Sequence, residues 1–113
     1  MRLYHRWKCP WCAAARQAIE NVGAEVELVE VPYPREERTQ VMVVSGQARV
    51  PVLEDGDLVL VDSRRIVSHL YAAVGEEPYA TEARELAEEI ARDEAAGRPP
   101  EACFIETEPA PAR

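Results

Sequence analysis

The residues of this sequence best suited to chemistry form the stretch Lys8-Cys9-Pro10-Trp11-Cys12. Two cysteines separated by two residues suit reversible exchange between a dithiol and a disulfide. Cys9 stands where a helix is predicted to begin, so unpaired backbone N–H groups and the positive end of the helix dipole favour its thiolate, the form that attacks a disulfide. Pro10 fits the first helical position, because its fixed φ is helical and its missing N–H is not needed there.

Cys12 follows one turn later, on the predicted helix face that also carries Ala15, Ile19 and Val22. These spacings place the four side chains on one buried side of the helix. We therefore expect Cys9 to be the exposed nucleophile and Cys12 to be the sheltered resolving thiol.

A zinc site is the main structural alternative for such a pair, and it would need two further ligands. The candidates are Cys103, His5 and His69, which form no second pair in the sequence. The sequence therefore predicts no metal site. We interpret Cys103 as a spare thiol.

Basic residues surround the cysteines. The first sixteen residues contain no acid and four bases: Arg2, Arg6, Lys8 and Arg16. Lys8, next to Cys9, is assigned a supporting role, because a nearby positive charge lowers a thiol pKa and attracts an anionic thiol. Arg2 and Arg16 fit solvated surface groups, and Trp11 fits an aromatic residue on the rim of the site.

Length and composition predict one globular domain of 113 residues with a core of its own. A net charge of −8 argues against nucleic acid as a partner. No run approaches the roughly 18 apolar residues of a membrane helix, and Met1 leads directly into a predicted strand without a signal-peptide pattern. We therefore expect a cytoplasmic monomer without membrane contact, in a compartment where thiols are kept reduced.

Hydrophobic pattern and turn residues predict the order strand, helix, strand, helix, strand, strand, helix, helix. The strands are expected at residues 3–5, 24–31, 50–53 and 58–61, and the helices at 10–22, 35–45, 63–74 and 79–95. The stretch 35–45 is the ambiguous one, because its valines also suit a strand. The start signal at Pro34, the stop signal at Gly46 and the need for a crossover favour a helix.

This order predicts a four-stranded mixed sheet with helices on both faces. The expected divisions are a core domain at residues 1–75, an acidic helical extension at 76–96 and a flexible tail at 97–113, where prolines and scattered acids show no periodicity.

Three landmarks then give a family resemblance: Cys9-Pro10-Trp11-Cys12 after a strand, Val50-Pro51 opening a strand and Asp62-Ser63 opening a helix. With these, residues 1–75 resemble the glutaredoxin branch of the thioredoxin-fold proteins. The pattern from Asp62 to Tyr71 is also similar to the N-terminal thioredoxin-like domain of glutathione transferases. The resemblance implies an α/β (α+β) thioredoxin-like fold.

The resemblance also implies a site for a small thiol. Pro51 is expected to be cis and to lie against the active-site disulfide, while the Val50 backbone pairs with the cysteinyl part of glutathione. Asp62 and Ser63 are expected to hold the γ-glutamyl end, whose carboxylate helix N–H groups can receive. Arg49 replaces a threonine common in glutaredoxins, and an arginine can bind a carboxylate. The predicted thiol-binding residues are Lys8, Arg49, Val50, Pro51, Asp62 and Ser63.

The leading hypothesis is a glutaredoxin-like dithiol oxidoreductase that reduces protein disulfides or mixed disulfides. Its reductant would be glutathione or another low-molecular-weight thiol, with a flavoprotein reductase as an alternative donor. A glutathione-transferase-like domain ranks lower, because only a short segment follows Gly75. An iron–sulfur carrier is disfavoured by Pro10 and Cys12, since such members usually have a glycine and a single cysteine.

Overall fold

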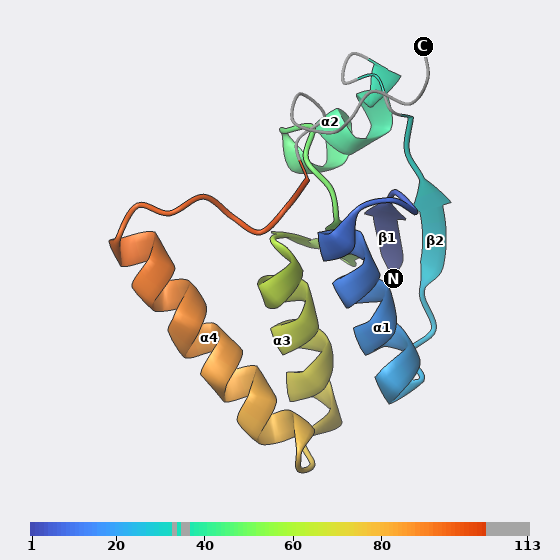
Figure 1. Cartoon of the computed structure of the whole chain (residues 1–113). Coiled ribbons are helices and arrows are strands. Elements are labelled where there is room, and N and C mark those ends of the chain that lie inside the picture. The colour runs from blue at the N-terminus through green and yellow to red at the C-terminus, as the bar shows by residue number, and fades with distance from the viewer. Residues whose placement is uncertain (33, 35–36, 104–113) are drawn as a thin grey trace.

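The computed structural model describes residues 1–32, 34 and 37–103, and its chain forms a sheet flanked by helices (Figure 1). The strands are β1 (Arg2–His5), β2 (Glu27–Glu30), β3 (Val52–Asp55) and β4 (Leu58–Val61). The helices are α1 (Pro10–Val22), α2 (Thr39–Ser45), α3 (Ser63–Val74) and α4 (Tyr79–Ala95).

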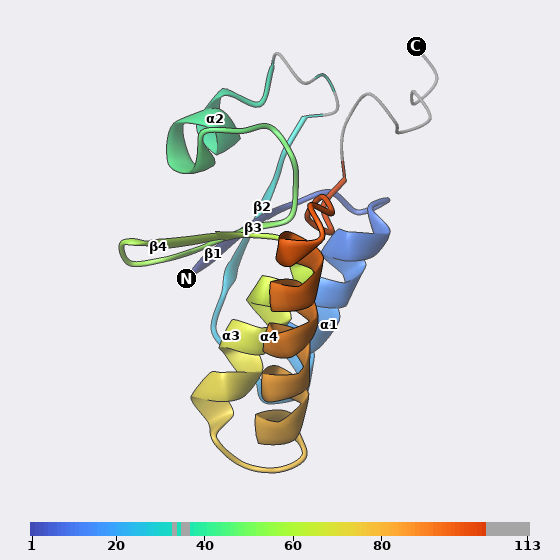
Figure 2. The same ribbon diagram turned by 90° about the vertical axis from the view of Figure 1, so that its left-hand side faces the viewer.

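The four strands form one mixed sheet in the order β2-β1-β3-β4. β1 runs parallel to β2 and antiparallel to β3, while β3 and β4 form the predicted hairpin. Helix α2 lies on one face of this sheet, and α1 and α3 cover the other (Figure 2). The predicted thioredoxin-like architecture, with helices on both faces, is confirmed. Helix α4 packs along α3.

Helix α2 begins later than predicted, at Thr39 instead of residue 35, although the prediction of a helix in this stretch is correct. The cause lies in Arg38, whose side chain is buried and donates to the backbone oxygens of Pro32 (2.8 Å) and Ala48 (2.7 Å). Arg38 therefore links the chain before α2, at Pro32, to the chain after α2, at Ala48. Residues 35 and 36 lie outside the described residues.

Apolar side chains form two clusters. One joins α1, α3 and α4 to the sheet and includes Leu3, Ala15 and Ile66. The other lies toward α2 and includes Cys9, Cys12, Tyr4, Val41, Val50 and Val52. The cysteines are therefore part of the packed interior. Among the described residues, no helix is both long and apolar enough to cross a membrane.

Candidate active site at Cys9

Cys9 occupies the N-cap position of α1, as predicted, with Pro10 as the first helical residue. Its extended backbone (φ −97°, ψ 119°) turns the side chain back over the first turn, where the Cys12 N–H donates to the Cys9 sulfur at 3.4 Å. The end of a helix leaves such N–H groups without intrahelical partners, so they are available to stabilise negative charge on this sulfur.

The state of Cys9 differs from the prediction. Its Sγ forms a disulfide with Cys103, 94 residues away in sequence, and only 2% of the residue is exposed. The expectations of an exposed Cys9 and of a spare Cys103 thiol are therefore wrong for this structure, because residues 101–103 lie over the start of α1. Cys12 forms no disulfide and is completely buried, as expected for a sheltered thiol.

The backbone of Val50 forms hydrogen bonds with the backbone of Cys103. The Cys103 N–H donates to the Val50 carbonyl oxygen at 2.6 Å, and the Val50 N–H donates to the Cys103 carbonyl oxygen at 3.3 Å. The two residues thus form an isolated antiparallel β-bridge. The Val50–Pro51 peptide bond is cis, as predicted, and Pro51 is buried. The backbone groups expected to bind a cysteinyl ligand are therefore engaged by a cysteine of the same chain.

The N-terminus of α3 holds the other end of this segment. Asp62 is the N-cap and accepts from the Arg64 N–H at 2.8 Å, as the capping prediction required. The Ser63 N–H donates to the Glu101 carbonyl oxygen at 2.8 Å, and the Glu101 N–H donates to Asp62 Oδ2 at 3.1 Å. The Ser63 hydroxyl lies 3.4 Å from Glu101 Oε1. Asp62 and Ser63 therefore bind the backbone of Glu101, and their predicted role toward the γ-glutamyl end of glutathione stays a prediction.

Arg64 was missed by the sequence analysis. Its guanidinium is buried, with 6% of the residue exposed, and it contacts four carboxylates: Asp62, Glu89, Asp93 and Glu101. Hydrogen bonding to Asp62 raises the pKa of Arg64 further above its usual value, while burial raises the pKa of Glu101. The available signal was an arginine directly after Asp62-Ser63, combined with the excess of acids in α4 (residues 79–95).

Arg16 is the second arginine whose role differs from expectation. It donates to the backbone oxygens of Arg6 (3.0 Å) and Trp7 (3.2 Å), lies over the Trp7 ring and contacts His5 Nδ1 at 3.0 Å. It therefore fixes the loop that leads from β1 to Cys9. Burial, together with the nearby Arg16 charge, lowers the pKa of His5. Arg2 pairs at the surface with Glu27, as a solvated group would.

The remaining predicted residues surround these contacts. Lys8 is exposed beside Cys9, and Trp11 is 38% exposed, which suits a rim position. Arg49 is partly buried, and the Gln47 side chain binds its backbone N–H (2.6 Å) and carbonyl oxygen (3.0 Å). Residues 104–113 of the predicted tail lie outside the described residues, whereas residues 101–103 are held at both ends.

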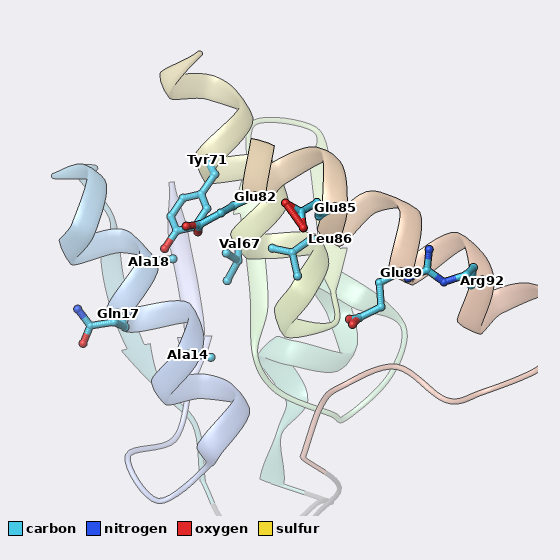
Figure 3. Close-up of a pocket in the computed structure, with 10 residues that line it drawn as sticks. All are labelled: Ala14, Gln17, Ala18, Val67, Tyr71, Glu82, Glu85, Leu86, Glu89 and Arg92. Carbon is cyan, nitrogen blue, oxygen red and sulfur yellow. The ribbon is translucent and has the colours of Figure 1, made fainter. Parts of the chain in front are cut away.

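A separate groove of about 590 Å³ lies between α1, α3 and α4 (Figure 3). Its lining includes Gln17, Val67, Tyr71, Leu86 and Arg92, and none of the predicted catalytic or thiol-binding residues. It is therefore distinct from the thiol site. Within the described ranges, no group of three or more His, Cys, Asp or Glu side chains could hold a metal ion.

Comparisons with known proteins agree with this fold. The family model described as "Glutathione S-transferase, N-terminal domain" matches residues 3–78. Glutathione S-transferase 4 of Zea mays is 38% identical over 65 residues, which cover 54% of this chain and 28% of the maize protein. The chain thus spans about a quarter of the length of this curated relative.

Solved glutathione transferases share the fold. The diazinon-metabolizing glutathione S-transferase of the silkworm Bombyx mori aligns with a TM-score of 0.60 and 24% identity, over 67% of this chain and 39% of that one. The trimeric glutathione transferase TDR1 of Leishmania gives 0.59 and 22%, over 68% and 17%. A possible glutathione S-transferase of Rhodopseudomonas palustris gives 0.57 and 26%, over 67% and 40%.

Proposed function

The chain belongs to the glutathione S-transferase N-terminal domain family, and on this premise we propose that it is a glutathione-dependent thiol–disulfide oxidoreductase with Cys9 as its nucleophile. The observation that carries the proposal is the Cys9 sulfur itself. It stands at the start of α1, is bonded to another cysteine, and lies beside Val50 backbone groups that engage a peptide segment. A helix N-terminus favours the thiolate that disulfide exchange requires.

The proposed reaction begins when the reduced Cys9 thiolate attacks the glutathione sulfur of a glutathionylated protein. A Cys9–glutathione disulfide forms, the original disulfide breaks, and the protein thiolate leaves with the bonding electron pair and takes a proton from water. A second glutathione thiolate then attacks the sulfur of the bound glutathione. Oxidised glutathione is released, and the Cys9 thiolate is restored.

Binding of glutathione would use the groups now engaged by residues 101–103. The Val50 N–H and carbonyl oxygen would pair with the cysteinyl residue. The Ser63 N–H at the start of α3 would receive the γ-glutamyl carboxylate, because a helix N-terminus favours an anion. Lys8 and Arg49 remain proposed contributors of positive charge. Protein disulfides and mixed disulfides in the cytoplasm are the proposed substrates.

The test is reduction of a glutathionylated peptide, with glutathione as the electron donor, by the wild type and by Cys9→Ser and Cys12→Ser variants. We expect Cys9→Ser to lower turnover at least about 100-fold, because the nucleophile is removed. The Cys12→Ser variant should keep measurable turnover, because the reaction above uses only one protein thiol. Full activity in Cys9→Ser would exclude this mechanism.

Conjugation of glutathione to an electrophile is a second candidate, favoured by the family match over residues 3–78. In this reaction, the sulfur of bound glutathione would attack an electrophilic carbon, and Cys9 would only stabilise the glutathione thiolate. Parallel assays with 1-chloro-2,4-dinitrobenzene and with the glutathionylated peptide separate the two functions. Turnover of the chlorinated substrate alone would favour conjugation.

A further inference from the structure

Residues 101–103 lie in the candidate thiol site as a segment attached at three points. The Cys103 sulfur is bonded to Cys9, the Cys103 backbone is bridged to Val50, and the Glu101 backbone is hydrogen-bonded to Asp62 and Ser63. The intervening Ala102 N–H donates to the Pro100 oxygen at 3.0 Å. The covalent bond and the backbone pairing together place a glutamate at α3 and a cysteine at α1.

This arrangement is similar to a γ-glutamyl-cysteine ligand in the order and spacing of its glutamate and cysteine, while Glu101 presents a backbone carbonyl oxygen in place of a free α-carboxylate to the Ser63 N–H. In glutathione, a γ-linked glutamate carries its α-carboxylate at one end and the reactive thiol on the next residue. In this chain, one alanine stands between Glu101 and Cys103. The covalent path from the glutamate Cα to the cysteine Cα through this alanine is about as long as the path through the γ-linkage of glutathione. The segment therefore meets the same backbone groups that the proposed function assigns to glutathione.

We propose that Glu101–Cys103 is an intramolecular ligand of the thiol site, and that Cys103, rather than Cys12, is the resolving thiol of Cys9. This inference rests on the proposed function. The Cys103 thiolate attacks the Cys9 sulfur of the Cys9–glutathione disulfide. The Cys9–Cys103 bond forms, the bond to glutathione breaks, and glutathione leaves as a thiolate that takes a proton from water. Two further glutathione molecules reduce the new disulfide and become one molecule of oxidised glutathione.

The surroundings of the two thiols favour Cys103. Cys12 is completely buried inside the cluster toward α2, with its own N–H directed at the Cys9 sulfur. Cys103 stands on a segment that hydrogen bonds hold to Val50, Asp62 and Ser63. The Cα atoms of Cys9 and Cys103 lie 6.2 Å apart, within the usual range for a disulfide.

Competition with glutathione follows from this geometry. The Val50 N–H and carbonyl oxygen each pair with Cys103, so a second cysteinyl ligand cannot form the same bridge while the segment is in place. A tethered segment acts at an effective concentration in the millimolar range when its attachment spans the site well. In the oxidised protein the Val50 backbone groups are thus unavailable to glutathione until a glutathione thiolate from solvent has reduced the Cys9–Cys103 bond.

Disulfide mapping tests the proposal directly. The reduced full chain is oxidised with oxidised glutathione, remaining thiols are alkylated, and the protein is digested with trypsin without reduction. Cys9 and Cys12 fall in one peptide, residues 9–16, while Cys103 falls in another, residues 93–113. We expect these two peptides to be linked, with Cys12 alkylated. A bond within the peptide 9–16 in most molecules would overturn the proposal.

Kinetics supply a second readout, with Cys103→Ser as the variant and Cys12→Ser as the matched control. Oxidised wild type and oxidised Cys12→Ser should show a lag before they turn over the glutathionylated peptide, because glutathione must first open the site. Cys103→Ser should show no lag, and its KM for glutathione should fall about two- to fivefold as the competing ligand is weakened. An equal lag in all three proteins would contradict the proposal.

The two proposals fail in different ways. If the peptides 9–16 and 93–113 are linked but no glutathionylated peptide is turned over, the intramolecular pairing holds and the glutathione activity fails. If turnover occurs but the disulfide joins Cys9 to Cys12, the activity holds and the role of Cys103 fails.

Discussion

The first turn of α1 and the first turn of α3 both hold residues 101–103, but by different means. At α1 the attachment is a disulfide from Cys9, which reduction breaks. At α3 it consists of hydrogen bonds from Glu101 to Asp62 and Ser63 and an ion pair with Arg64, which reduction leaves intact. Reduction therefore breaks the covalent attachment at α1, while the contacts at α3 and the Cys103–Val50 bridge do not depend on it.

The two helix ends also differ in electrostatics. At α3, one buried guanidinium balances several carboxylates, including the fully buried Asp62. At α1, Arg16 fixes backbone oxygens of the preceding loop, and no described acid pairs with it. The α3 end is thus stabilised by charges paired around a buried guanidinium, whereas the α1 end depends on loop hydrogen bonds.

Loss of Arg64 should give the largest change in stability. The variant Arg64→Ala leaves the Asp62 carboxylate buried without its cation, and breaking a buried pair in this way costs about 3–5 kcal/mol. Urea unfolding measures the change in the free energy of unfolding. The neighbouring variant Arg65→Ala removes a partly exposed side chain that pairs with Glu94 at the surface; it is the matched control and should change the free energy of unfolding by less than about 1 kcal/mol. Similar changes in the free energy of unfolding for both variants would contradict the claim that a buried charge pair stabilises the α3 end.

The corresponding variant at α1 should have a smaller effect. Arg16→Ala removes hydrogen bonds to the Arg6 and Trp7 oxygens, and it should lower the free energy of unfolding by about 1–3 kcal/mol. Gln17→Ala, next to it on an exposed face of α1, serves as the control. The same urea titrations compare the two. An Arg16 effect as large as that of Arg64 would show that the α1 end also depends on a buried charge.

Acid should weaken the α1 end through His5. Burial lowers the folded-state pKa of His5, so the unfolded chain binds the proton first as pH falls below the ordinary value of about 6.5. His5 faces Arg16, which also lowers its pKa, and Glu30, which raises it. Stability contributed by neutral His5 is therefore present above about pH 6.5 and is lost below it, with a slope of up to about 1.4 kcal/mol per pH unit.

The measurement is the free energy of unfolding from about pH 7.5 to about pH 5.5 in wild type, His5→Gln and His69→Gln. The free energy of unfolding should fall less with decreasing pH in His5→Gln than in the wild type. His69→Gln should show the wild-type fall, because His69 lies elsewhere, against Asp55. Equal slopes in wild type and His5→Gln would show that another group causes the decline.

Glu101 should give the smallest effect. Glu101→Ala removes the carboxylate contacts with Ser63 and Arg64 but leaves the backbone bonds of the segment in place. The measurement is the fraction of protein with the Cys9–Cys103 bond in buffers of reduced and oxidised glutathione. The equilibrium constant for forming this bond should be about two- to fivefold lower in Glu101→Ala than in the wild type. Glu88→Ala, an exposed acid on α4, is the control. If the two variants have the same equilibrium constant, only the backbone of residue 101 contributes to the stability of the Cys9–Cys103 bond.

Much of this arrangement could be predicted from local sequence. The bounds of α1, β4 and α4 match the predictions, because Pro10, Gly23, the Asp55-Gly56 turn and the period of α4 are local signals. The cis Val50–Pro51 bond and the Asp62 cap were also predicted correctly. These features depend on residues close together in sequence or on a family pattern with fixed spacing.

The contacts that were missed depend on distant residues. Cys12 lies three residues from Cys9, whereas Cys103 lies 94 residues away on a segment without periodicity, so spacing alone did not indicate the Cys9–Cys103 bond. The same holds for Arg64, whose carboxylate partners Glu89, Asp93 and Glu101 come from later parts of the chain. The available hint was a glutamate two residues before the third cysteine, which matches the spacing of a glutathione-like ligand.

The most direct test of the central claim, that Cys9 accepts glutathione, uses the double variant Cys12→Ser/Cys103→Ser, in which Cys9 is the single cysteine. The reduced protein is mixed with oxidised glutathione, and its intact mass is measured before and after addition of reduced glutathione. We predict one bound glutathione per chain, formed by the folded protein and removed by the reductant. A folded protein that stays unmodified, while the same protein in urea is modified, would contradict the assignment of Cys9 as the reactive thiol.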